Sequence, residues 1–204
     1  SNQASVTFNV IDVNDPPVAI DQTQYVDEDN STSFELLGSD PDGDNITFSL
    51  VESPENGTAQ LVGSLVVYTP HNNFFGEDHV HFVSNDGEYD SEVGTVTVIV
   101  VGINDAPNAS EFEFYLSDSY DFSSGVSDPD GDNLTFSVGS ATSGTLSLSG
   151  SLATYTPNTN FNGDDSFTFT VSDGSESSSA SVSLSVSAVN DAPVLASVSD
   201  VSFD

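Results

Sequence analysis

Apolar and polar residues alternate with a period of two along most of this 204-residue chain. The apolar members fall in the runs 34–36, 46–50, 66–68, 80–82 and 96–100 of the first half, and 134–138, 146–148, 167–171 and 182–186 of the second. Gly, Pro, Asn and Asp cluster between these runs, about every 8–12 residues. The pattern predicts short, half-buried β-strands joined by turns, and no stretch shows a helical period.

The second half of the chain repeats the first. The segment 56–87 matches 143–174, for example in GSLVVYTP and GSLATYTP, and VNDPPV at 13–18 recurs as INDAPN at 103–108. The repeat is about 86–90 residues long, the size of one small domain. We therefore expect the last strand of a preceding repeat at 1–13, complete repeats at 14–103 and 104–189, and the start of a following repeat at 190–204.

Each repeat has the strand content of a β-sandwich. About six or seven short antiparallel strands in one such repeat predict a Greek-key sandwich of the immunoglobulin type. An up-and-down barrel is disfavoured because the repeats are short and separate cleanly. The predicted fold class is all-β, with two tandem sandwiches.

The charge of the chain restricts its partners. It holds 33 Asp and Glu, three His and no Lys or Arg, which gives a net charge of −33. Nucleic acids and anionic membranes both need basic residues to bind, and no apolar run approaches the roughly 20 residues of a membrane span. Such self-repulsion favours binding of cations. An acidic surface that only keeps a salt-tolerant protein soluble is the alternative explanation for the scattered carboxylates.

The clustered carboxylates point to a hard cation. SDPDGDN stands at 39–45 and again at 127–133, and the chain has no Cys. Asp-Pro-Asp-Gly favours a type I turn, but the turn does not account for the further Asp and Asn. Ca²⁺ takes 6–8 oxygen ligands of these types, whereas thiolate chemistry and soft-metal sites are excluded. An EF-hand is also excluded, because its sixth position would be Asn45 instead of Gly and its twelfth Val51 instead of Glu.

One such loop offers too few oxygens, so other repeated segments should converge on it. These are the Asn-Asp pairs before the prolines, the Asp-Gly turns near the end of each repeat, and the acidic segment 26–30, which is reduced to LSDSY at 116–120.

The chain resembles the tandem cadherin-like repeats, of the VCBS type, found in large bacterial extracellular adhesins. The motifs that carry the resemblance are VNDAPV at 189–194, DED at 27–29, SDPDGDNLTFSV at 127–138 and ASVSLSV at 180–186. The resemblance covers both repeats and implies Ca²⁺ at the ends of the domains. It also implies an extracellular location, on a bacterial cell surface or secreted.

The resemblance also implies a set of ligands. Those of the central junction are Glu28, Asn104, Asp105, Asp128, Asp130 and Asp173, and the backbone carbonyl of Asn133 is a further candidate. The cadherin Asp-x-Glu before the sixth strand has no counterpart, and Asp78, beside Glu77, lies closest to its place. The outer half-sites would use Asn14, Asp15, Asp40, Asp42 and Asp86 at one end, and Asp118, Asp165, Asn190 and Asp191 at the other.

These observations favour a calcium-stiffened spacer of an adhesin, in cell adhesion or biofilm formation, with calcium and neighbouring repeats as partners. The alternative is a module that recognises surface glycans or proteins, attached to a secreted protein or enzyme. The chain has no Trp, and Tyr25, Tyr89, Tyr115 and Tyr120 are the aromatic residues outside the inward pattern. Catalysis is not expected, because the carboxylates lie in tight repeated turns without a nucleophile or a cationic partner.

His79 and His81 would share one face of a strand. Two imidazoles at this spacing are able to ligate a metal, but Ser166 and Thr168 occupy the matching positions of the second repeat. An exposed strand face is therefore the expected role of this pair.

Overall fold

The computed structural model describes residues 3, 5–9, 13–115 and 119–193. The chain divides into two compact units, Ser1–Ile103 and Asn104–Asp204. The described residues of 1–13 and of 187–193 lie outside strands. The assignment of 1–13 and 190–204 to flanking repeats stays a prediction, because a strand of another repeat would need partner strands from that repeat.

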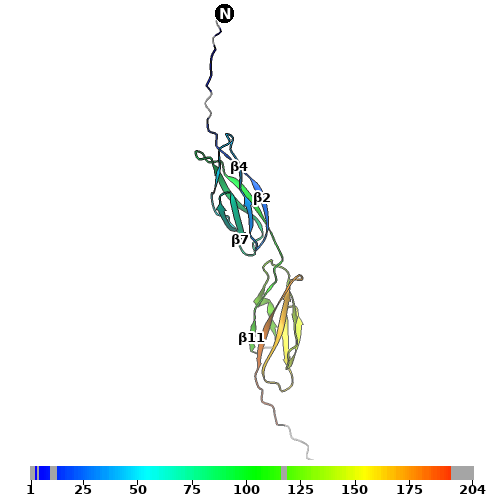
Figure 1. Cartoon of the computed structure of the whole chain (residues 1–204). Helices are drawn as coiled ribbons and strands as arrows, with labels where there is room; N and C mark the ends of the chain where they lie inside the picture. The colour runs from blue at the N-terminus through cyan, green and yellow to red at the C-terminus, as the bar shows by residue number, and fades with distance from the viewer. Residues whose placement is uncertain (1–2, 4, 10–12, 116–118, 194–204) are drawn as a thin grey trace, which may run out of the picture. The chain divides into compact units, whose positions relative to one another are not determined.

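The first unit is a sandwich of two main sheets (Figure 1). One sheet has the order β2-β9-β8-β5 and the other β3-β7-β6, while β1 pairs with β4 beside them. The strands are β1 (Val18–Ile20), β2 (Gln22–Asp27), β3 (Thr32–Glu35), β4 (Leu37–Ser39), β5 (Thr47–Leu50), β6 (Gly57–Val62), β7 (Leu65–Pro70), β8 (Gly76–Asn85) and β9 (Gly94–Val101).

The second unit repeats this topology. Its sheets have the orders β11-β18-β17-β14 and β12-β16-β15, with the pair β10-β13 beside them. Its elements are β10 (Asn108–Ala109), β11 (Phe112–Tyr115), β12 (Tyr120–Asp121), η1 (Phe122–Gly125), β13 (Val126–Ser127), β14 (Thr135–Val138), β15 (Gly144–Ser149), β16 (Leu152–Pro157), β17 (Gly163–Ser172) and β18 (Ser177–Val186). The predicted all-β fold in two tandem repeats is confirmed.

The expectation that all strands are antiparallel is wrong for one pair in each unit. β2 pairs in parallel with β9, with Tyr25 opposite Ile99, and β11 pairs in parallel with β18. A strand near the start of each unit and its last strand therefore run in the same direction, so the chain enters a unit at one end and leaves at the other. The alternating pattern gives no information about direction, since it is the same for both kinds of pairing.

The inward members of the alternation form the cores. In the first unit the fully buried side chains include Val66, Tyr68, Val80, Phe82 and Val96, which come from both sheets. In β8 the exposed and buried residues alternate almost without exception, as the sequence pattern predicts for a strand with one face on the core.

The short 3₁₀ turn η1 is where the second unit departs from the first. It lies between β12 and β13, the counterparts of β3 and β4, which only Leu36 separates in the first unit. Asp121 caps it by accepting a hydrogen bond from Ser123 N (3.0 Å), and Phe122 is buried and stacks on Phe169 with ring centroids 4.5 Å apart. Among the described residues no helix has the length and apolarity that crossing a membrane requires.

Candidate metal centre

In the first unit, the acidic turn and the segment before β1 are tied together by hydrogen bonds. Asp42 Oδ2 accepts a bond from Asp15 N (2.7 Å), and Asn14 Nδ2 donates to Asp86 Oδ2 (2.9 Å). Asp40 Oδ1 accepts bonds from the backbone N–H groups of Asp42 (2.9 Å) and of Asp44 (3.1 Å). The structure thus brings together the predicted residues Asn14, Asp15, Asp40, Asp42 and Asp86.

The second unit contains the same arrangement. Asp105 N donates to Asp130 Oδ2 (2.8 Å), and Asn104 Nδ2 donates to Asp173 Oδ2 (3.2 Å). Asp128 Oδ1 accepts bonds from Asp130 N (3.0 Å) and Asp132 N (3.1 Å). Five predicted ligands therefore converge here too, and two copies of one network show that the sequence repeat encodes side-chain positions as well as strands.

The backbone of the acidic turn explains its Gly. Gly43 N donates to the carbonyl of Asp40, and Gly131 N to that of Asp128, each at 3.3 Å, which closes a four-residue turn. Gly43 and Gly131 have φ values of +85° and +78°. This left-handed conformation strains residues with a side chain, so Gly at this place lets the chain turn without strain.

The carboxylates of the second unit fit a bound cation. Asp128, Asp130 and Asp132 each have a carboxylate oxygen within 4.8 Å of the others. Asp128 Oδ2 is buried and has no hydrogen-bond partner among the described residues, and the same holds for Asp40 Oδ2 in the first unit. A buried carboxylate oxygen without a donor is costly unless a cation binds it. Asp132 was not in the predicted ligand set, and the structure adds it to the cluster.

The Asp-Gly turns near the end of each unit hold ionised carboxylates. Asp86 Oδ1 accepts hydrogen bonds from Tyr89 N and Glu88 N, both 2.7 Å, and these lower the pKa of the Asp86 carboxyl below its usual value. Hydrogen bonds from Glu176 N and Ser175 N lower the pKa of Asp173 in the same way. Both groups therefore stay charged at the pH values at which Ca²⁺ binds carboxylates.

Asp78 and Asp165, two of the predicted ligands, have a structural role instead. Asp78 is 2% exposed, and its carboxylate accepts four hydrogen bonds. The donors of these bonds are Glu55 N (3.1 Å), Asn56 N (3.0 Å), Tyr68 Oη (2.8 Å) and His79 N (2.9 Å). A carboxylate with four protein donors needs no cation, so we leave both residues out of the ligand set proposed below.

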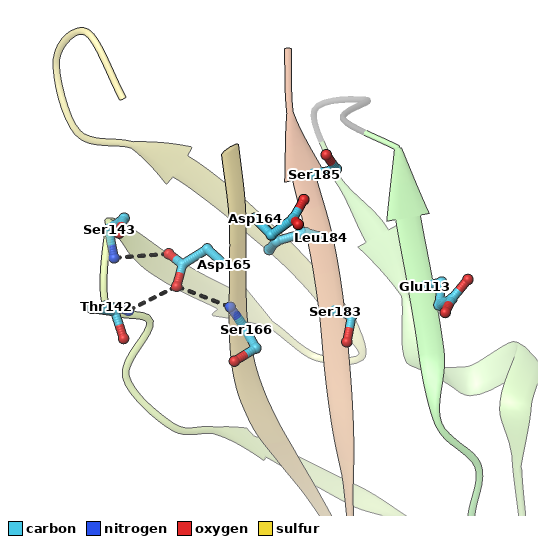
Figure 2. A pocket seen from close by; sticks show the side chains of 9 residues that line it. All are labelled: Glu113, Thr142, Ser143, Asp164, Asp165, Ser166, Ser183, Leu184 and Ser185. Carbon is cyan, nitrogen blue, oxygen red and sulfur yellow. Dashed lines mark hydrogen bonds between the residues drawn. The ribbon is translucent and has the colours of Figure 1, made fainter. Parts of the chain in front are cut away.

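Asp165 makes the equivalent contacts in the second unit, and Figure 2 shows its carboxylate facing the backbone of Thr142 and Ser143, in the loop between β14 and β15. Its donors are Thr142 N (3.1 Å), Ser143 N (2.8 Å), Tyr155 Oη (2.8 Å) and Ser166 N (2.9 Å). We call this arrangement, with Tyr68–Asp78 in one unit and Tyr155–Asp165 in the other, the Tyr–Asp clamp. Burial raises the pKa of Tyr155 to about 12, and its bond to Asp165 acts in the same direction.

The residues of the Tyr–Asp clamp recur in both repeats, and this recurrence could have identified the clamp from the sequence. Tyr68 and Asp78 recur as Tyr155 and Asp165, although their neighbours Glu77 and His79 change to Asp164 and Ser166. Gly57 recurs as well, as Gly144, because a Cβ at Gly57 would lie 2.7 Å from the Tyr68 hydroxyl. Gly, Tyr and Asp are kept at these three positions in both repeats while neighbouring residues differ. This pattern indicates that the three residues contact one another within each repeat.

The Asp165 clamp predicts a pH-dependent stability. Burial acts to raise the pKa of Asp165, but the hydrogen bonds outweigh it and the pKa is lowered below its ordinary 3.8. The ionised form therefore stabilises the fold above about pH 4, and this contribution is lost as the pH falls through the lowered pKa. We expect Asp165→Asn to be less stable than the unchanged chain at pH 7, and the difference to shrink towards pH 3. Urea unfolding across this range measures the difference, and a difference independent of pH would contradict the assignment.

The remaining predicted residues lie elsewhere. Glu28 is 3% exposed, and its Oε1 accepts a 2.6 Å hydrogen bond from Ile103 N, at the end of the first unit. Glu28 Oε2 is buried without a hydrogen-bond partner among the described residues. Asn190 and Asp191 are exposed. Asp118 lies outside the described residues.

An open pocket on the second unit lies beside Asp165. It has a volume of ≈ 590 Å³, and Figure 2 shows Asp164, Asp165 and Glu113 among the residues around it, together with hydroxyl side chains. Asp165 is ionised and held by four donors, which makes it unsuited to donate or accept protons. The pocket therefore gives the unit a polar, acidic surface.

Comparison with known proteins agrees with this architecture. A family model described as a bacterial Ig domain matches residues 14–99 and 104–185. Integrin beta-like protein B of Dictyostelium discoideum is 26% identical over 114 residues, which cover 48% of this chain and 6% of that protein. The chain thus spans only a small part of this curated relative.

Two solved structures of human proteins are similar in fold. The first two extracellular cadherin repeats of mucin-like protocadherin have a TM-score of 0.53 and 16% identity, over 84% of this chain and 98% of that one. The same repeats of protocadherin-24 have a TM-score of 0.53 and 16% identity, over 88% of this chain and 100% of that one. At this identity the likeness extends to the fold alone.

Proposed function

Because the chain belongs to the bacterial Ig domain family, we propose that it is a calcium-binding spacer segment of a larger extracellular adhesin. Each unit would bind Ca²⁺ through its acidic turn, and the ion would fix the segment that leads into that unit. The observation that carries the proposal is the repeated network in which Asp42 holds Asp15 N and Asp130 holds Asp105 N. A ligand bound to such a network acts on the linker as well as on the turn.

The chemistry of the donors supports Ca²⁺ over other ions. The proposed ligands are carboxylate oxygens, of Asp128, Asp130 and Asp132 in the second unit and of Asp40 and Asp42 in the first, together with linker oxygens. Ca²⁺ accepts such oxygens in flexible arrangements, whereas zinc prefers imidazole and thiolate. When bound, the ion would supply positive charge to oxygens such as Asp128 Oδ2 that have no donor among the described residues.

The segment 103–105 joins the first unit to the second, and each of its residues has a contact within one of the units. Glu28 holds Ile103 N, and Ile103 is followed directly by Asn104 and Asp105, whose contacts are to Asp173 and Asp130. Ile103, the last anchored residue of the first unit, is therefore followed directly by Asn104, the first anchored residue of the second. We propose that Ca²⁺ stiffens this short linker, with Glu28 contributing as the cadherin resemblance implies, and that without the ion the acidic groups repel one another.

Recognition of a glycan or a protein is the second candidate. Tyr25 on β2 is 68% exposed, and Phe75 and Tyr89 are exposed as well. Exposed aromatic side chains are common contacts in binding sites. A glycan array screened with the calcium-loaded chain tests this candidate separately, because the spacer proposal needs no glycan.

Calorimetry and scattering together test the spacer. We expect isothermal titration with Ca²⁺ to show saturable binding, and small-angle X-ray scattering to show a narrower distribution of lengths in Ca²⁺ than in chelator. Mg²⁺ at the same ionic strength is the control, because it binds all-protein oxygen sites less readily. Binding without any change in the length distribution would refute the stiffening, and absence of binding at millimolar Ca²⁺ would refute the proposal as a whole.

A further inference from the structure

The outer face of β8 carries three potential metal ligands in a row. Glu77, His79 and His81 alternate with Asp78, Val80 and Phe82, which are buried, so the first three point away from the core. Their side chains are 58%, 45% and 30% exposed, respectively. This row of ligands belongs to the first unit alone, because the second repeat has no histidine.

Two of these groups already have the spacing of ligands to one ion. Ligands that lie about 2.0–2.1 Å from a tetrahedral Zn²⁺ are about 3.4 Å from each other. His79 Nε2 lies 3.4 Å from Glu77 Oε1. The rings of His79 and His81 are stacked, with centroids 5.9 Å apart and an angle of 23° between their planes. Binding of the second imidazole to the same ion requires the partly exposed rings of His79 and His81 to tilt towards one another.

His81 is oriented by a neighbouring strand. Its Nδ1 lies 3.0 Å from Thr95 Oγ1, on β9 directly opposite. When Nδ1 carries the proton and donates to this hydroxyl, Nε2 is left with its lone pair free for a metal, the usual arrangement of a ligating histidine. That nitrogen lies 3.8 Å from Glu52 Oε1, so a second carboxylate is near the same ring.

We propose that Glu77, His79 and His81 form a surface site for a divalent transition ion of the zinc class. Two imidazoles and one carboxylate are a ligand set of catalytic zinc sites, with the fourth position left to water or to another molecule. Ca²⁺ takes oxygen ligands, so the two classes of ion would occupy separate places on the chain. The high negative charge of the chain attracts either cation.

The second repeat supplies the matched variant. Asp164, Ser166 and Thr168 stand where the first repeat has Glu77, His79 and His81, and the strand β17 forms normally around them. The double substitution His79→Ser and His81→Thr therefore copies residues that this fold accepts. It removes both imidazoles without placing an apolar or bulky group on the sheet.

Titration of the full chain with ZnCl₂ in calcium-containing buffer tests the proposal. We expect one equivalent of Zn²⁺ to bind more tightly than the rest, and the double variant to lose this equivalent. Ser166→Ala with Thr168→Ala is the control in the second unit and should leave it unchanged. Equal zinc binding by the unchanged chain and the His79→Ser, His81→Thr variant would overturn the proposal, as would loss of the equivalent in the control.

The histidine ring signals in NMR give an independent readout. The chain has three histidines, and His71, exposed in a turn outside β8, serves as the internal reference. One equivalent of Zn²⁺ should shift the ring signals of His79 and His81 and leave those of His71 in place. Equal shifts at all three rings would mean unspecific binding and would contradict the assigned site.

Discussion

Replacing Asp128 and Asp130 with asparagine should abolish most of the stabilisation of the second unit by Ca²⁺ without destabilising the metal-free protein. Asparagine keeps the oxygen that accepts hydrogen bonds from Asp130 N, Asp132 N and Asp105 N. It removes two negative charges from a cluster whose oxygens lie within 4.8 Å. Repulsion in the metal-free state therefore falls, while the charge that attracts Ca²⁺ is lost.

The expected size of this effect follows from mass action. Ca²⁺ at a hundredfold excess over its dissociation constant stabilises the folded state by about 2.7 kcal/mol. For a domain of this size that is a rise in melting temperature of roughly 10–20 °C. Thermal unfolding with and without Ca²⁺, combined with hydrogen exchange in β17 and β18, assigns the change to the second unit.

The equivalent substitutions in the first unit serve as the control. Asp40→Asn with Asp42→Asn should remove the calcium effect from β8 and β9 and leave the second unit stabilised. The proposal is wrong if Ca²⁺ protects the second unit of the Asp128→Asn, Asp130→Asn variant as well as it protects the unchanged chain.

Removing the acceptor of the Tyr–Asp clamp should strongly destabilise the first unit. We expect Asp78→Ala to cost about 3–5 kcal/mol of unfolding free energy, because several donors around a buried position lose their acceptor at once. Tyr68→Phe removes a single hydrogen bond and leaves the ring packed, so it should cost only about 1 kcal/mol. Urea unfolding in chelator, without zinc or calcium, measures both.

Glu77→Ala provides the comparison for Asp78→Ala. Glu77 is the preceding residue on the same strand, and its side chain is 58% exposed. Its loss should change the unfolding free energy by no more than about 0.5 kcal/mol. Similar costs for the two substitutions would show that the four hydrogen bonds of Asp78 contribute little to the fold.

The fold could be predicted from the sequence because the same alternation of apolar and polar residues occurs in both repeats. Val80 and Phe82 alternate with outward residues in the first unit, as Phe167 and Phe169 do in the second, and all four are buried. The convergence of Asp15 with Asp42, and of Asp105 with Asp130, could be expected from the number of oxygens that Ca²⁺ needs and from the resemblance to cadherin-like repeats. Periodicity alone could not supply it, since it describes faces of strands and says nothing about loops.

Two features were beyond the sequence patterns for physical reasons. The parallel pairing of β2 with β9 has the same alternation as an antiparallel pair, so direction is invisible in the residues. The contacts of Asp78 could not be predicted, because its position near the place of the cadherin Asp-x-Glu suggested a ligand. What distinguishes Asp78 from Asp42 is its 2% exposure and its contact with Tyr68, both of which depend on packing between distant strands.

The parallel pairing of strands at the start and end of each unit has a mechanical consequence. When the two ends of such a unit are pulled apart, the force acts along β2 and β9, across the direction of the hydrogen bonds between them. The register from Gln22 opposite Val96 to Asp27 opposite Val101 is then loaded all at once in shear. Hairpin strands pulled from one end would instead open bond by bond, so this topology resists force applied along the chain.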